Sequence, residues 1–582
     1  MKNNFELKEA FVETKESIEE KKPRNIISDM EAGINGYFHE NNLEKEVAIS
    51  EMTNKKFGDI TFNTSEFSQE FDHGELLNYI QDEFGPYITS VQEIEGHVNI
   101  VFDKKMIASE VVNKNILRKS LLLHRGKNYE VEFGHLNLDK PQKVGQLRNF
   151  FTGRGINNML KLAGANIKTN VIINDVGMKA SKLFYAAINN WSEFESISQK
   201  NGYEYYEGLK ALFKKIDEEE NAEEEIKILN ATLSKQLQGN KAIENNELMH
   251  KVNAITGKSL NEMKVLWKDL GIIVDGINLQ SKYEKKTDNK TELMEKGLFS
   301  NLFYQKDELV FVNTDEIGLG QHVLVKKDGT DTYIIKDLVS LIDRLSDIKN
   351  DKEYICVGPS LFDHYNVVKY ILNKLYPELI SRMKIIYHQL SHTDKDTNTN
   401  LYSFLDKINQ KINIKKENNE IAEKDIIRTN LIYQNVINNL NSHVNINIEK
   451  FIQNKGDSGT YILYTINRFD KLFSLLYNDA PDITKGSIKI EDIPELSSSE
   501  NDLLTKFLFL RKTLDRAINI ENPAHIYREF MSLGKLLNSC YHEIPKLRRM
   551  VAENKIEEIK ARVVILKKLF DEYKYIFSIL FS

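Results

Sequence analysis

The chain has 582 residues, of which 41% are hydrophobic and 28% are charged. This length exceeds one hydrophobic core, so three or four domains are expected. A formal net charge of −7 excludes a uniformly basic nucleic-acid coat, and two lone cysteines exclude a disulfide framework or a cysteine zinc site. Neither a targeting peptide nor an apolar run of membrane-spanning length is visible, so a cytoplasmic location is expected.

The first 118 residues are predicted to form a small α/β domain. Apolar residues follow helical spacing to about residue 42 and again in "DHGELLNYIQDEF" (72–84). The segment "HVNIVF" (97–102) alternates between apolar and polar residues, as a half-buried strand does.

A strand, a helix and a second strand then follow within a short stretch. The strand "NYEVEF" (128–133) precedes a helix that begins near Val144 and ends before Gly164, which suits a helix C-terminus. The second strand is "KTNVIIN" (168–174). Strands joined by a crossover helix run parallel, so this unit predicts a parallel sheet.

Helices are expected from about 185 to 290, after which the parallel-sheet pattern resumes. Its strands are expected at "ELVFVN" (308–313), "HVLV" (322–325), "EYICVG" (353–358) and "MKIIYHQL" (383–390). The polar stretch 391–400 has the composition of a loop, and residues after about 441 are almost all helical in pattern.

These segments, in this order, resemble the arginyl-tRNA synthetase family. The matching stretches are "VEFGHLNLDKPQKVGQLRNFF", "DGTDTYIIKDL", "VGPSLFDHYNVVKYIL" and "LGKLLNSCYHEIPKL". The resemblance implies a multidomain α/β fold of class I, with a Rossmann-type parallel sheet in a catalytic domain at 119–440 and a helical insertion at about 185–290. It places a domain like the family's tRNA-elbow-binding domain at 1–118. Residues 441–582 would form an all-α stem and anticodon-binding-like bundle.

The resemblance puts the ATP phosphate site at the start of the helix near Val144. The family's HIGH tetrapeptide is Lys143-Val144-Gly145-Gln146 here, so both histidines are replaced. A helix N-terminus offers unpaired N–H groups to phosphate. The loop at 391–400 holds no KMSKS motif, but Lys140 stands where such enzymes carry a compensating lysine. ATP with Mg²⁺ is the implied cofactor if the chain is active. Without the resemblance, Lys143 is equally well interpreted as a solvated surface lysine.

An arginine pocket is implied by four further matches. Tyr333 and Asp337 are four residues apart, so they share one face of a helix, and they match the family's guanidinium-binding pair. Glu132 and Asn137 match the residues that hold the two ends of the substrate's backbone. Without the resemblance, a Tyr/Asp pair at this spacing is more often an exposed helix face.

The C-terminal end is basic on an acidic chain, with fifteen Lys and Arg against ten Asp and Glu after residue 500. An RNA-binding surface is predicted there, since exposed aromatics stack on unpaired bases and cations neutralise phosphates. The alternative for the aromatics is packing between helices. The residues predicted to bind tRNA are Asn538, Tyr541, Lys546, Arg548, Arg549 and Arg562.

The altered ATP site favours a degenerate paralogue that keeps tRNA binding, with an arginine pocket and weak or absent adenylation. The alternative is an active, divergent arginine–tRNA ligase, and a third reading is attachment of arginine to something other than tRNA. The expected partners are arginine and an arginine-type tRNA, a protein partner is left open, and neither DNA nor a membrane is expected. No metal site is expected, because His135 and His364 lack companions at ligand spacing.

Overall fold

The structure is a computed structural model that describes residues 25–67, 71–114, 116–239, 246–393, 396–414, 421–453, 455–483, 487–542, 549, 553 and 556–582. The chain divides into two compact units. The first holds residues up to Leu121 with 482–512 and 555–568, and the second holds 122–481, 513–554 and 569–582. The domain boundaries expected at 118 and 440 stay predictions.

The first unit contains a four-stranded antiparallel sheet in the order β1-β2-β4-β3. Asp72 starts α2 by accepting hydrogen bonds from the N–H groups of Gly74 and Glu75, and β4 spans the predicted strand at 97–102. Its elements are β1 (Ser50–Glu51), β2 (Ile60–Asn63), β3 (Ile88–Ile94), β4 (His97–Phe102), α1 (Ile26–Glu40), α2 (His73–Phe84), α3 (Lys104–Lys114) and α4 (Ile116–Ser120).

The second unit is built on a five-stranded sheet in the order β12-β11-β5-β6-β7, and every pair in it is parallel. This confirms the predicted strand–helix–strand unit, and α5 (Val144–Leu162) joins its two strands. Gly164, just past that helix, adopts the left-handed conformation that favours glycine. The strands are β5 (Asn128–Asn137), β6 (Asn166–Asn174), β7 (Gly276–Leu279), β11 (Lys352–Val357) and β12 (Met383–Tyr387).

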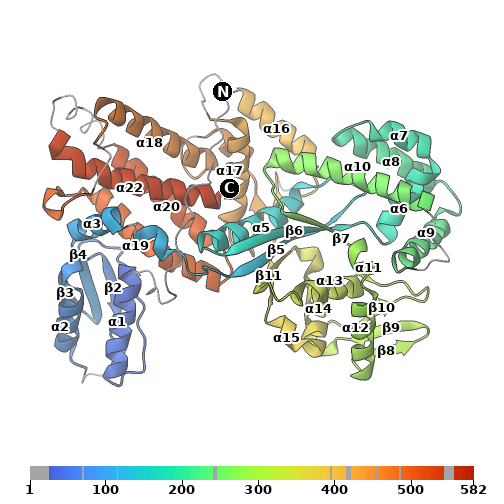
Figure 1. Cartoon of the computed structure of the whole chain (residues 1–582), viewed down its shortest axis with the longest axis horizontal. Coiled ribbons are helices and arrows are strands. Elements are labelled where there is room, and N and C mark those ends of the chain that lie inside the picture. The colour runs from blue at the N-terminus through green and yellow to red at the C-terminus, as the bar shows by residue number, and fades with distance from the viewer. Residues whose placement is uncertain are drawn as a thin grey trace. The chain divides into compact units, whose positions relative to one another are not determined.

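Helices cover both faces of this sheet. Figure 1 shows α5 and α10 (Asn246–Leu270) on one side and α13 (Tyr333–Leu345) and α14 (Phe362–Leu375) on the other. Such double coverage explains why the three central strands of the sheet carry long buried runs. The other helices between β6 and α13 are α6 (Met178–Asn189), α7 (Trp191–Ser198), α8 (Tyr203–Asp217), α9 (Ala222–Leu237), α11 (Ser281–Glu284) and α12 (Thr287–Phe299).

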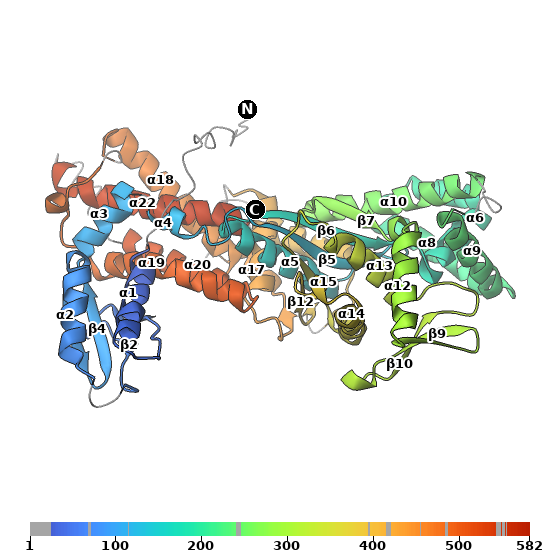
Figure 2. The same cartoon turned by 60° about the horizontal axis from the view of Figure 1, so that its bottom comes forward.

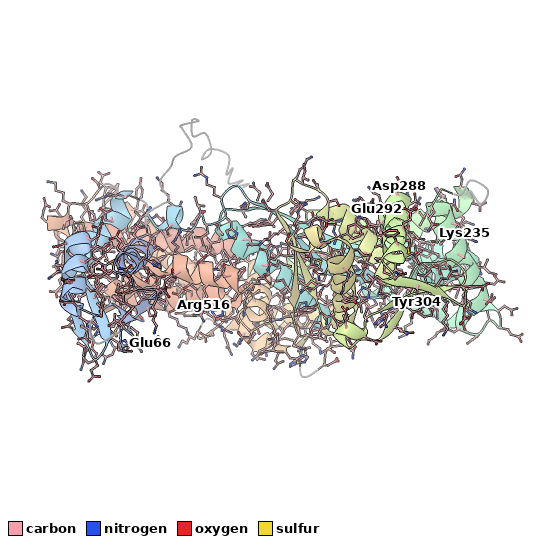
Figure 3. The ribbon with its side chains drawn as sticks, turned by 90° about the horizontal axis from the view of Figure 1, so that it is seen from below. Glu66, Lys235, Asp288, Glu292, Tyr304 and Arg516 are labelled. Atoms are coloured by element: carbon pink, nitrogen blue, oxygen red, sulfur yellow. The ribbon has the colours of Figure 1, made fainter. Side chains whose placement is uncertain are left out.

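Two sequence expectations about this sheet are wrong. The segments 308–313 and 322–325 do not continue it, because they belong to a separate three-stranded sheet. In that sheet β9 (Leu309–Asn313) is the central strand and pairs antiparallel with both β8 (Phe303–Lys306) and β10 (Gln321–Val325). In Figures 1 and 2, β9 and β10 lie beside α12. That helix buries Leu293 and Gly297, and its exposed side carries Asp288 and Glu292 (Figure 3). Conversely, β7 is a sheet strand inside the stretch expected to be helical.

The remainder is mainly helical, as expected. A short parallel pair joins β13 (Ser391–His392) to β14 (Val444–Asn445). No helix among the described residues is both long and apolar enough to span a bilayer. The helices are α15 (Pro377–Ile380), α16 (Leu401–Ile414), α17 (Glu423–Val436), α18 (Gly459–Asp479), α19 (Ser498–Asn519), α20 (Ala524–Tyr541) and α22 (Ile556–Leu580).

A substitution at Gly153 tests how closely α5 packs on the sheet. A Cβ at Gly153 would collide with the Phe133 ring of β5, so Gly153→Ala should lower the free energy of unfolding by about 1–3 kcal/mol. The control is Gly257→Ala in α10, where a Cβ would meet nothing within 4 Å. That variant should be neutral or stabilised by up to about 1 kcal/mol. Chemical denaturation checks both, and equal effects would contradict the packing described.

Candidate functional site

The residues predicted for the ATP and arginine sites lie on elements that meet where the sheet reverses its order. From β5 the chain moves to β6 on one side, and β11 lies on the other side. Helices on opposite faces leave a crevice at the carboxyl ends of such strands, which is where open α/β sheets bind ligands. Asn137 ends β5, α5 begins shortly after it, and α14 follows β11. The candidate site is therefore at the switch point of the sheet.

The N-terminus of α5 is filled by the protein's own backbone. The N–H groups of Val144 and Gly145 donate to the carbonyl oxygens of Thr399 and Thr397, at 2.9 and 3.0 Å. A Cβ at Gly145 would lie 3.2 Å from the Thr397 oxygen, so the glycine permits this close approach of the loop. The N–H groups that would hold a phosphate are thus already satisfied.

The two residues that replace the HIGH histidines are also engaged. Gln146 folds back so that its Oε1 accepts the N–H of Lys143, the residue before the helix, at 2.8 Å. This is one half of a capping box, because the lysine side chain has no oxygen that could complete the other half. The Lys143 ammonium donates to Asn398 Oδ1 at 2.9 Å. Lys143, Gly145 and Gln146 therefore lie together, but Lys143 and Gly145 bind the segment 396–400 and Gln146 binds Lys143.

Lys140 is the exception among the predicted phosphate ligands. Its side chain is exposed, and no ion pair or hydrogen bond of its ammonium occurs with any residue that the structure describes. One free cation does not make a phosphate cradle, since the oriented backbone donors are taken. The residues present do not fit ATP phosphate in this arrangement of the loop.

The carboxylates predicted for the arginine pocket are buried in an ionic network. Glu132 Oε2 lies 2.6 Å from an Arg344 nitrogen, and Glu132 Oε1 lies 3.1 Å from His135 Nε2. Asp337 Oδ2 lies 2.6 Å from His364 Nε2, and its Oδ1 lies 3.8 Å from His135 Nδ1. Glu132 and Asp337 thus belong to one network, although they come from a strand and a helix.

Burial and charge oppose each other in this network. Burial favours the protonated carboxyl, yet Arg344 and His135 lower the pKa of Glu132 below its usual value. Likewise, His135 and His364 outweigh burial and lower the pKa of Asp337. Burial raises the pKa of Glu353 to about 7 despite its contact with Arg344. Both predicted pocket carboxylates are therefore held as anions.

The sequence prediction missed Arg344, Glu353 and the pocket role of His135. Arg344 contacts Glu132 of β5 and Glu353 of β11, the second at 2.7 Å. Its place seven residues after Asp337, two helical turns on, puts both side chains on the same face of α13. An arginine among the many apolar residues of a buried helix is the signal that could have found it.

Tyr333 and Asn137 are placed differently from the carboxylates. Tyr333 begins α13 and is 42% exposed, with its hydroxyl next to Gly177 after β6. Asn137 accepts a hydrogen bond from Asn174 Nδ2 at 3.1 Å, across the ends of β5 and β6. Tyr333 and Asp337 share one helix, as predicted, but Tyr333 is exposed and Asp337 is buried.

In the C-terminal helices, Asn538 and Tyr541 contact other protein groups. Asn538 is buried and donates to Tyr461 OH and Thr465 Oγ1 of α18. The Tyr541 ring is half-buried, with the Arg468 guanidinium 3.7 Å from its centroid. This geometry corresponds to the alternative reading, packing between helices, with Arg468 as a cation that sequence reasoning overlooked.

The described tRNA-binding cations of the prediction, Arg549 and Arg562, belong to different units. Lys546 and Arg548 lie outside the described residues. Arg549 belongs to the second unit, where its side chain is 81% exposed and pairs with Glu553. Arg562 belongs to the first unit and contacts Glu500 at 3.0 Å.

A separate cleft of about 520 Å³ lies between the end of α10 and the start of α17. Trp267, Lys268 and Arg428 are among its lining residues, and no predicted site residue lines it. Among the described residues, no group of three or more His, Cys, Asp or Glu side chains has the arrangement of a metal site.

Comparisons with known proteins agree with this architecture. The family model described as tRNA synthetases class I (R), catalytic domain, matches residues 107–389. The chain is 21% identical over 539 residues to arginine–tRNA ligase 1 of Bacillus thuringiensis, covering 88% of this chain and 92% of that protein. It is 27% identical over 368 residues to the ligase of Treponema denticola, covering 60% of each.

Solved structures show the same fold. Thermus thermophilus arginyl-tRNA synthetase matches with a TM-score of 0.72 at 14% identity, covering 96% of this chain and 99% of that one. The Plasmodium falciparum enzyme matches with a TM-score of 0.70 over 97% of this chain and 99% of that one, also at 14% identity. The fold and the site define a class I aminoacyl-tRNA synthetase architecture. Within that class, the chain belongs to the arginyl-tRNA synthetase family.

His388, which follows β12, should make the protein sensitive to acid. Burial, with Arg148 nearby, lowers the pKa of His388 to about 4. Below pH ~6.5 His388 takes up a proton in the unfolded chain but not in the folded chain. The free energy of unfolding therefore falls by roughly 3 kcal/mol as the pH is lowered to 4. His388→Gln should lose this component between pH 6.5 and 4 in denaturation measurements.

The control for this prediction is His542→Gln, which changes an exposed histidine at the end of α20. It should keep the wild-type pH dependence of unfolding. A His388→Gln profile parallel to the wild-type one would contradict the assignment.

Proposed function

We propose that this arginyl-tRNA synthetase-like chain is a degenerate paralogue that keeps binding of an arginine-type tRNA and an arginine pocket, and that adenylates arginine weakly or not at all. Membership of the arginyl-tRNA synthetase family does not depend on this proposal. ATP with Mg²⁺ would matter only for residual activity.

The observation that carries the proposal is the occupied start of α5. Thr397 and Thr399 accept the first N–H groups of the helix, and Gln146 caps Lys143. Preorganised donors of this kind stabilise charge in a transition state, and removing one costs roughly 10²–10³ in rate. Here two imidazoles are replaced and two backbone donors are engaged, which supports strongly reduced adenylation.

The alternative, an active ligase, is favoured by Lys140. Its exposed ammonium is free to meet a phosphate if the segment 396–400 moves away. The contacts that hold this segment on the helix are neutral hydrogen bonds and one Lys–Asn contact. Each contributes only about 0.5–1.5 kcal/mol net, or about 1.5–3 where the donor is charged, so tRNA or ATP binding could displace it.

A direct test is ATP–pyrophosphate exchange with arginine and tRNA present. The wild-type chain should show no exchange above background, because its phosphate donors are taken. The double variant Lys143→His/Gln146→His restores two imidazole donors and removes the Gln146 cap. It should raise exchange by at least tenfold if the rest of the site is intact.

The outcomes separate the two functions. Clear wild-type exchange would overturn the degenerate reading and establish an active ligase. Silence in the wild type with activity in the double variant would support loss of function confined to the helix start. Silence in both, with tRNA still bound, would support a binding protein with a more deeply altered site.

Binding of tRNA should weaken with salt, because cation–phosphate contacts release counterions. Arg549→Gln should lower affinity and reduce the slope of log K against log salt by about 0.7–0.9. Filter binding over a salt series measures this. The control is Lys227→Gln, since Lys227 is likewise exposed and paired with a Glu four residues away. Salt-independent binding would contradict the proposed tRNA surface.

A further inference from the structure

An imidazole of the protein itself lies between the Glu132 and Asp337 carboxylates. The His135 imidazole lies 3.1 Å from Glu132 through Nε2 and 3.8 Å from Asp337 through Nδ1. Among the described residues, it is the one side chain with an ionic contact to both carboxylates. Tyr365 OH, 3.1 Å from Nε2, helps to hold the ring in place.

The backbone places His135 at this point. Gly134 has a φ of +94°, and the pairing of β5 with β6 shifts register between Glu132 and His135. This bulge sets Glu132 and His135 on the same side of the strand, although they are three residues apart. Gly134 also leaves room for the Asn149 amide, with which an added Cβ would collide.

A guanidinium needs carboxylate oxygens with free lone pairs, because it binds through two parallel N–H···O bonds. Glu132 Oε2 is taken by Arg344, and Asp337 Oδ2 is taken by His364. The remaining oxygens, Glu132 Oε1 and Asp337 Oδ1, both face His135. Glu132 Oε1 is buried without a well-aligned hydrogen bond, so it has capacity for a better-placed donor.

We propose that the His135 imidazole is a resident cation of the amino-acid pocket, which competes with the cationic groups of arginine, its α-amino group and its guanidinium, for Glu132 and Asp337. The inference rests on the proposed function, in which this pocket is kept. His135 is thereby a specificity-determining residue, and its charge state decides whether a cationic amino acid enters.

The surrounding charges come from four elements. Glu132 lies on β5, Asp337 and Arg344 on α13, His364 and Tyr365 on α14, and Glu353 on β11. Burial alone would lower the pKa of His135, but Asp337 and Glu132 raise it above the usual value. The imidazole therefore keeps its proton to a higher pH than an ordinary histidine does.

The competition gives a defined pH dependence. Below the pKa of His135, arginine must displace one proton to reach the carboxylates, so its affinity should rise about tenfold per pH unit. Above that pKa the affinity should level off, since arginine keeps its charge. L-citrulline, which has the same shape without the charge, should show no such rise.

The experiment is calorimetric titration of the full-length chain with L-arginine and L-citrulline at pH 6, 7 and 8. His135→Ser removes both charge and bulk, so it should bind arginine already at pH 6, without the rise towards pH 8. His135→Gln keeps the size and removes the charge, and it should also lose the pH dependence. The matched control is His124→Gln, because His124 likewise contacts a tyrosine hydroxyl at 3.1 Å but faces no pocket carboxylate.

The proposal is supported if wild-type affinity rises with pH, or if only the His135 variants bind. It is overturned if the wild type binds arginine equally at pH 6 and 8, or if folded His135 variants bind no better than wild type at pH 6. If His135→Ser fails to fold, the wild-type pH series and His135→Gln decide the matter. Pyrophosphate exchange tests the proposed function separately, so an active ligase with pH-gated arginine binding would refute that function alone.

Discussion

The contact on which the switch point depends is the buried pairing of Arg344 with Glu132 and Glu353. These carboxylates lie on β5 and β11, the neighbouring strands at which the order of the sheet reverses. Arg344 comes from α13, which covers one face of that sheet. Removing one partner of such a buried pair leaves an unpaired charge and costs about 3–5 kcal/mol. The network ties the middle of β5 and the start of β11 to the helix that carries Asp337, so the site and the fold share one set of interactions.

The same site shows how a family architecture persists while its chemistry changes. The helix start that would receive a phosphate keeps its geometry, including Gly145, but the segment 396–400 supplies the acceptors. The pocket that would receive a guanidinium keeps Glu132 and Asp337, but His135 and Arg344 supply the cations. In both places protein groups stand where ligand groups would bind, since buried donors and carboxylates need partners.

Sequence patterning predicted the elements that are long and periodic. The limits of α5 and β4 match the prediction because each has an unbroken period and a clear end signal, such as Gly164. The prediction failed at β9 and β10, whose apolar runs suit either a parallel or an antiparallel sheet, and at β7, which is only four residues long. Periodicity gives the face that a strand buries, but not the strand with which it pairs.

The sequence by itself determined the class of fold, the family and the loss of both histidines, because these depend on the order and identity of residues along the chain. Only the tertiary structure decided which groups meet: Arg344 with Glu132, His135 with Asp337, Thr397 with Gly145, and Arg468 with Tyr541. The two partners of each pair lie far apart in sequence, and no local pattern specifies them. Whether a carboxylate or an N–H group is free for a ligand is a property of such contacts, so it is decided in three dimensions.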